Sequence, residues 1–212
     1  ILSFASSIKE IISVLKMPAV WLIAVVVLAA YSAYWGAYRF TSYSTDIFSL
    51  SVIAAGAISI GKMVMSPPSA LIAGFVSDKV GIAKSIIVLF FVLIVSFIIF
   101  AFLPGIPSFL PVMLINVAIA SFAIFALRAI YYALLEEGGI PVVVTGTATG
   151  FISMIGFTPD IFMPLLGGIL LDSMPTIEGY RAFFISVAVI CGLGLAASIF
   201  LYRIALERKK NG

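Results

Sequence analysis

The sequence has no histidine, a single cysteine and few charged residues. Of its 212 residues only 10% are charged, whereas 63% are hydrophobic. Without histidine, the chain alone can build no Ser-His-Asp triad, no histidine-ligated zinc site and no histidine proton relay. With Cys191 alone it can form no internal disulfide and no thiolate metal site. We therefore expect neither an enzyme nor a bound cofactor, and we expect Cys191 to pack in the interior.

The scarcity of charge also excludes a soluble fold. An average soluble domain has roughly 25% charged residues, and this chain has a mean hydropathy of +1.28. Its net charge of +3 comes from basic residues at the ends of apolar runs and not from one basic face. That distribution argues against a nucleic-acid partner and predicts a lipid bilayer instead.

Six apolar runs, each about long enough to cross a bilayer, define an all-α integral membrane protein. Pro67 and Pro68 are expected to kink the second run, because each removes a helix hydrogen bond. The predicted spans are residues 17–43, 50–76, 85–103, 109–135, 143–171 and 182–202.

The two ends differ from this membrane part, which covers residues 17–203. Residues 1–16 place Ile8, Ile11 and Ile12 on one helical face, and Ser7 and Glu10 have capping-box spacing. We predict an amphipathic linker on the membrane surface there and a basic tail over residues 204–212. The chain begins at Ile1 and is interpreted as a fragment of a longer polypeptide.

Lysine and arginine gather on one side of the predicted membrane, which orients the chain with both ends in the cytoplasm. The other side carries Arg181. The cytoplasmic set is Lys9, Lys16, Lys79, Lys84, Arg203, Arg208, Lys209 and Lys210.

Four ionisable residues lie inside the apolar runs: Arg39, Lys62, Arg128 and Asp160. A charge near the bilayer centre costs about 2.5 to 3.5 kcal/mol, so such residues persist mainly where they pair or face a polar path. They are the first candidates for function. Three cations against one carboxylate favour an anionic substrate.

Helical spacing places polar groups beside these charges. Tyr31, Tyr34, Trp35 and Tyr38 form one stripe, which could contact a sugar-like solute or serve helix packing and an interfacial aromatic belt. Lys62 and Asp160 lie at similar depth and could pair, or compete for a proton and a substrate anion.

Arg128 lies nearer the cytoplasmic end and shares a face with Tyr132. Its guanidinium could grip a carboxylate at two points, or it could be a structural residue paired with Glu136 or Glu137.

The joint after the second run reads G-F-V-S-D-K-V-G from Gly74 to Gly81. Gly74 would let two helices approach closely, Asp78 could cap or pair with a neighbouring helix end, and Gly81 would permit the turn. With Lys79, these residues could form a conformational latch. The alternative is a charged turn after a membrane helix.

The pattern G-x-x-x-D-[RK]-x-G resembles the cytoplasmic loop motif of the major facilitator superfamily. The fifth run, rich in glycine and proline and ending P-x-x-G-G-x-x-x-D at Asp172, is similar to that superfamily's penultimate helix. The resemblance implies a C-terminal half, six transmembrane helices of a 12-helix fold, in a bacterial plasma (inner) membrane. An N-terminal six-helix half of the same polypeptide would be its partner.

The resemblance further implies secondary active transport, by alternating access and coupled to protons, of a small polar anion such as a sugar acid or organic anion. Asp160 would couple the proton. The substrate would contact Tyr31, Tyr34, Tyr38, Arg39, Lys62, Arg128 and Tyr132. Alternatives are a non-transporting scaffold, a channel, or a phosphate-ester exchanger.

Overall fold

A computed structural model describes residues 4–211, except for the side chains of residues 4–8, 209 and 211. The face predicted for Ile8 and the cap predicted for Ser7 lie outside the described residues. Every element is helical in this part of the chain. The elements are α1 Phe4–Leu15, α2 Pro18–Phe48, α3 Val52–Val64, α4 Ser66–Val80, α5 Ile82–Phe102, η1 Pro107–Phe109, α6 Leu110–Ile130, η2 Tyr131–Ala133, α7 Leu134–Glu137, η3 Val142–Val144, α8 Thr145–Gly156, α9 Pro159–Ser173 and α10 Thr176–Asn211.

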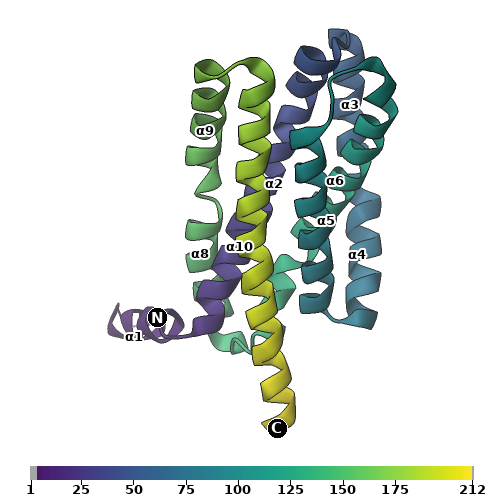
Figure 1. Cartoon of the computed structure of the whole chain (residues 1–212). Coiled ribbons are helices and arrows are strands. Elements are labelled where there is room, and N and C mark those ends of the chain that lie inside the picture. The colour runs from purple at the N-terminus through teal and green to yellow at the C-terminus, as the bar shows by residue number, and fades with distance from the viewer. Residues whose placement is uncertain (1–3, 212) are drawn as a thin grey trace.

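Helices long and apolar enough to cross a membrane confirm an all-α, multi-pass membrane protein. Five stretches qualify within the described residues, and they run side by side in Figure 1. Each covers all or nearly all of one predicted span and extends beyond it at one end or both. They are Pro18–Phe48, Ile82–Phe102, Pro107–Glu137, Val142–Ser173 and Thr176–Arg208.

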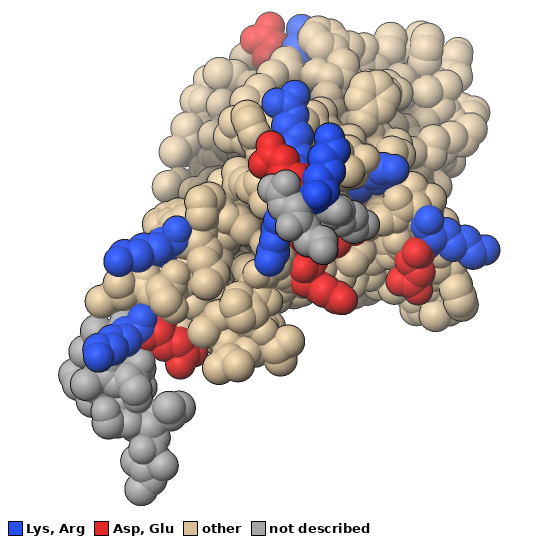
Figure 2. Space-filling model, turned by 90° about the horizontal axis from the view of Figure 1, so that it is seen from below, with Lys and Arg blue, Asp and Glu red and all other residues tan. Residues whose placement is uncertain are grey.

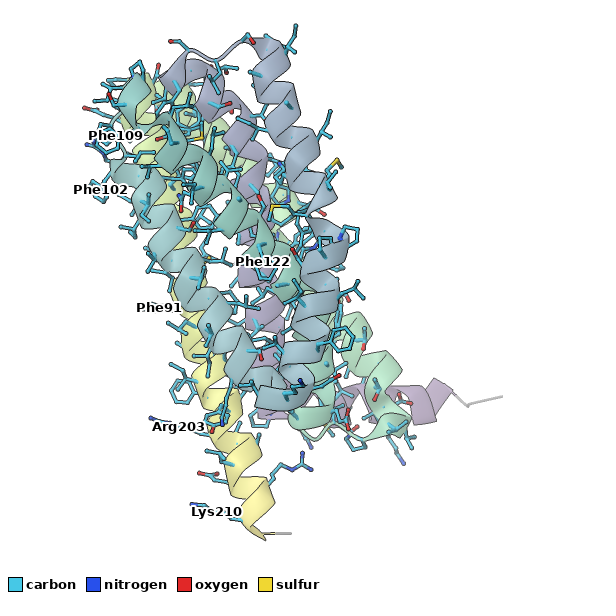
Figure 3. The ribbon with its side chains drawn as sticks, turned by 90° about the vertical axis from the view of Figure 1, so that its right-hand side faces the viewer. Phe91, Phe102, Phe109, Phe122, Arg203 and Lys210 are labelled. Atoms are coloured by element: carbon cyan, nitrogen blue, oxygen red, sulfur yellow. The ribbon has the colours of Figure 1, made fainter. Side chains whose placement is uncertain are left out.

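The remaining predicted span is divided between α3 and α4, which follow one another end to end (Figures 1 and 3). The interruption falls at Met65, two residues before Pro67, and neither Pro67 nor Pro68 can donate a helix hydrogen bond. Backbone bonds still cross the joint, from Met65 N to Gly61 O at 3.2 Å and from Ser69 N to Met65 O at 3.1 Å. The predicted kink is therefore present, as an almost continuous helix bent at the prolines.

An aromatic core joins α2, α5 and α10. Phe40 and Phe100 have ring centroids 4.5 Å apart, and Phe184 lies 5.2 Å from Phe100. Tyr43 donates a hydrogen bond to the carbonyl of Phe100 at 3.2 Å, so its buried hydroxyl is satisfied. Cys191 is also fully buried, as expected.

Close helix approach on this side depends on glycine. A Cβ on Gly194 of α10 would lie 2.5 Å from the Phe90 ring and 2.6 Å from the Ala29 Cβ. Small residues let membrane helices pack by direct van der Waals contact. Gly194 therefore fixes how closely α10 lies against α5 and α2.

Helix α1 lies across one end of the bundle, and the chain's two ends lie at that same end (Figure 1). Ile11 and Ile12 on α1 are exposed, and Trp21 Nε1 donates to the carbonyl of Leu15 at 2.9 Å. An amphipathic helix in this position suits the membrane interface. Helix α10 continues through the predicted basic tail as far as Asn211.

Candidate functional site

Three of the four intramembrane charges lie at helix ends that are themselves inside the membrane part. Lys62 is in the last turn of α3, Arg128 in the last turn of α6, and Asp160 in the first turn of α9. A helix dipole favours cations at its C-terminal end and anions at its N-terminal end. Each charge therefore has the sign that its helix end stabilises.

Local sequence explains the break beside Asp160. Helix α8 ends at Gly156, and α9 begins at Pro159, which has no backbone N–H to donate to the preceding turn. A Cβ on Gly156 would collide with Val27 of α2, so the glycine lets the end of α8 rest against that helix. The break thus sets Asp160 beside the middle of α2.

Asp160 accepts hydrogen bonds from two aromatic residues of α2. Trp35 Nε1 donates to Oδ1 at 2.9 Å, and the Tyr31 hydroxyl donates to Oδ2 at 3.4 Å. The Tyr31 ring also packs on Phe157, with centroids 4.9 Å apart. The carboxylate is exposed in this chain but oriented by α2.

Arg128 lies over the same aromatic stripe. Its guanidinium carbon is 4.0 Å from the ring centroid of Tyr34 and 5.6 Å from that of Tyr31, both within cation–π range. Tyr34 in turn shares a hydrogen bond of 3.1 Å with Tyr38. We call these residues the polar cluster: Tyr31, Tyr34, Trp35, Tyr38, Arg128 and Asp160.

Lys62 borders the polar cluster without pairing with Asp160. Its ammonium donates to the carbonyl of Ala37 at 2.8 Å and lies 5.2 Å from the Tyr38 ring centroid. The proposed Lys62–Asp160 pair is therefore wrong for this structure. Physically, the ammonium reaches the backbone of α2 before it reaches the carboxylate, which α2 binds through Trp35 and Tyr31.

Arg39 and Tyr132 lie outside the polar cluster. Arg39 packs against α9, where a Cβ on Gly167 would be 2.7 Å from Nη2, and it lies 5.9 Å from the Phe183 ring centroid. Tyr132 shares a hydrogen bond of 2.7 Å with Ser153 and so links η2 to α8. Neither residue is brought to Asp160.

The loop between α4 and α5 is stabilised by a residue that sequence reasoning did not assign to it. Glu137, at the end of α7, accepts from the backbone N–H of Ile82 at 2.9 Å and of Ala83 at 2.8 Å. It thereby caps α5, a role we had expected of Asp78. The signal in the sequence was the acidic pair Glu136–Glu137 at the end of the fourth apolar run. The sequence did not indicate its target, because Ile82 lies 55 residues from Glu137.

The other predicted latch residues have simpler surroundings. Gly81 has a φ of 103°, so the turn requires glycine as expected. Asp78 and Lys79 are exposed. Gly74 has open space where a Cβ would stand, so the close helix approach predicted there is wrong within the described residues. Arg128 is also not held by Glu137, because that carboxylate caps α5.

Two proteins of Escherichia coli (strain K12) are similar to this chain over most of its length. Inner membrane protein YihN is 31% identical over 216 residues, covering 98% of this chain and 50% of the relative. Inner membrane protein YqcE is 24% identical over 201 residues, covering 92% of this chain and 47% of the relative. The chain therefore spans about half the length of the curated relatives it matches.

These findings overturn the assignment to the major facilitator superfamily. No family model matches the chain, and both relatives are named only as inner membrane proteins. No solved structure matches it either. The loop motif and the glycine-rich fifth run therefore do not establish that family, and the site must be interpreted from its own geometry.

Proposed function

We propose that this chain is part of a transmembrane transporter that moves a small, polar, anionic solute by opening its polar side alternately to the two faces of the membrane. The observation that carries the proposal is the polar cluster, in which three separate spans bring a guanidinium, a carboxylate and tyrosine hydroxyls together inside the membrane. A structural scaffold has no need of such a cluster, because each charge placed inside the membrane is costly.

The broken spans support a moving path. Interrupted membrane helices supply backbone groups and helix dipoles to transported solutes, and they are tolerated where they line a cavity. Here the interruptions at Met65 and at residues 157–158 lie beside Lys62 and Asp160. Charge and helix break coincide at both places, which is the arrangement that a coordinating site requires.

Charge sign supports an anionic solute. Arg128 is paired with aromatic rings in this structure, so its guanidinium keeps hydrogen-bond donors available for a carboxylate. Lys62 supplies a second cation at the edge of the polar cluster. Asp160, exposed and held by Trp35, is the group we assign to proton coupling.

We place the protein in a bacterial inner membrane, since both relatives are named for that membrane. We infer that both ends described here face the cytoplasm, because basic residues gather around the end of the bundle seen in Figure 2. We also propose that the exposed polar side is covered by the remainder of a longer polypeptide, as the relatives are about twice as long.

The test is uptake of labelled sugar acids, organic acids, sugars and sugar phosphates into vesicles containing the full-length protein, with and without a pH gradient. Gradient-dependent uptake of one anion is expected. Arg128→Gln and Asp160→Asn should each reduce it by roughly tenfold or more, as the loss of a charged hydrogen bond implies. Arg203→Gln, which removes a cation outside the polar cluster, is the matched control.

Uptake that survives Lys62→Gln, Arg128→Gln and Asp160→Asn together would contradict the assigned roles. Gradient-independent counterflow of a sugar phosphate would instead identify a phosphate-ester exchanger. Absence of any transport, with normal membrane insertion, would favour a scaffold.

A further inference from the structure

We propose that the end of the bundle carrying both termini binds the headgroup of an anionic phospholipid, in a cavity between the α1–α2 joint with the start of α2, the turn after α7, and α10. This inference does not depend on the proposed transport function. The cavity has a volume of about 350 Å³. Its walls include Lys16 and Arg208, with apolar side chains of Met17, Ile140 and Ile204.

The cavity's ionisable lining is wholly basic. Lys16 and Arg208 are the charged residues that line it, and no carboxylate does so among the described residues. Arg208 also lines a neighbouring cavity of about 840 Å³, whose charged lining includes Asp78, Glu136 and Glu137 together with Lys79 and Lys84. Glu137, however, already accepts two backbone N–H groups of α5, so its oxygens are engaged elsewhere.

Backbone conformation fixes Arg208 at the cavity's edge. Gly139 has a φ of +70°, and a Cβ there would lie 0.6 Å from Arg208 Nη1. The guanidinium therefore occupies space that only a glycine leaves open. Pro141 and the Gly138–Gly139 turn also line the cavity.

The level of the cavity matches the headgroup region of a bilayer. Helix α1, which ends just before Lys16, lies across the end of the bundle with Ile11 and Ile12 exposed (Figure 1). Trp21 is 48% exposed one turn into α2, and tryptophan is enriched at the membrane interface. A site at this level meets lipid phosphates before it meets free solutes.

The lining distinguishes a lipid from a free anion. Cations beside a membrane helix attract acidic headgroups, and basic pockets between helices are known lipid sites. The apolar side chains on the same walls suit a glycerol backbone and the start of an acyl chain, which inorganic phosphate lacks. We therefore assign the cavity to one anionic phospholipid.

The test is native mass spectrometry of the delipidated full-length protein titrated with dioleoyl-phosphatidylglycerol. In Lys16→Gln/Arg208→Gln, the tightest binding event should weaken by roughly thirtyfold, since each cation near an anionic surface contributes about fivefold. Arg203→Gln/Lys210→Gln removes two cations from the same end of α10, pointing away from α1 in Figure 3, and should retain wild-type affinity.

Three results would overturn the proposal: equal weakening in both double variants, equal binding of dioleoyl-phosphatidylcholine, or displacement of the lipid by millimolar inorganic phosphate. If Lys16→Gln/Arg208→Gln does not fold, the single variant Lys16→Gln at an exposed side chain serves instead. It should weaken the tightest binding by about fivefold, and unchanged affinity would contradict the assignment.

Discussion

Two sides of the bundle differ in how their helices are built. On the packed side, α5 and the membrane part of α10 run without a break and join α2 through the aromatic core around Phe184. On the polar side, α3–α4 and α8–α9 are interrupted inside the membrane part. The polar cluster lies on the polar side, on the face of α2 that meets α9.

The difference shows where charge can be placed in a membrane helix. Between Lys84 and Phe102, α5 carries no Asp, Glu, Lys or Arg, and α10 carries none between Arg181 and Arg203. Lys62, Arg128 and Asp160 instead lie where a helix ends, because a helix end supplies a dipole that a continuous helix interior does not. Charge and helix end therefore coincide at these three positions, whereas Arg39 lies within the unbroken α2.

The largest expected effect is on the packed side. Phe184→Ala should lower the free energy of unfolding by about 3 kcal/mol, because Phe184 is fully buried among several aromatic rings. Equilibrium unfolding in mixed micelles measures this. Phe91→Ala is the control, since Phe91 projects outward from α5 in Figure 3 and is 61% exposed. Equal losses of unfolding free energy in both variants would show that the aromatic core is not what stabilises the packed side.

Next in size is Gly194→Ala, for which we expect a loss of about 2 kcal/mol from overpacking against Phe90 and Ala29. Gly192→Ala, two residues earlier on α10, has open space around the new methyl group and should be neutral or slightly stabilising. The same unfolding measurement compares them. If Gly194→Ala were as stable as Gly192→Ala, the close packing of α10 would be disproved.

A smaller effect is expected at the cap of α5, on the packed side. Glu137→Gln should cost about 1 kcal/mol by weakening the charged cap on α5. Hydrogen exchange at the amides of Ile82 and Ala83 should accelerate, whereas Glu136→Gln, at an exposed neighbouring carboxylate, should leave it unchanged. Unaltered exchange in Glu137→Gln would show that this cap does not form.

The smallest stability effect is expected in the polar cluster itself. Trp35→Phe removes the hydrogen bond to Asp160 and should change the free energy of unfolding by about 0.5 kcal/mol, because that carboxylate is exposed. Solute uptake should nevertheless fall. A large loss of stability with normal uptake would mean that the polar cluster serves packing.

Much of this arrangement could be predicted from local sequence. Apolar length predicted the five helices that are long enough to cross a membrane, Pro67 and Pro68 predicted the bend between α3 and α4, and helical spacing predicted the tyrosine stripe that contacts Arg128 and Asp160. The partners of Lys62 and Glu137 could not be predicted, because they depend on how helices distant in sequence are rotated against each other. The loop motif was misleading about family, since a short turn pattern constrains only the local backbone.

We infer that the polar side faces a water-filled path and that the packed side faces lipid. This inference is tested most directly by single cysteines in an otherwise cysteine-free full-length protein, labelled in vesicles with a water-soluble thiol reagent. Tyr38→Cys and Ser153→Cys on the polar side should react roughly tenfold faster than Phe91→Cys and Val189→Cys, since a thiolate forms only where water reaches it. Equally slow reaction at all four positions would contradict the account.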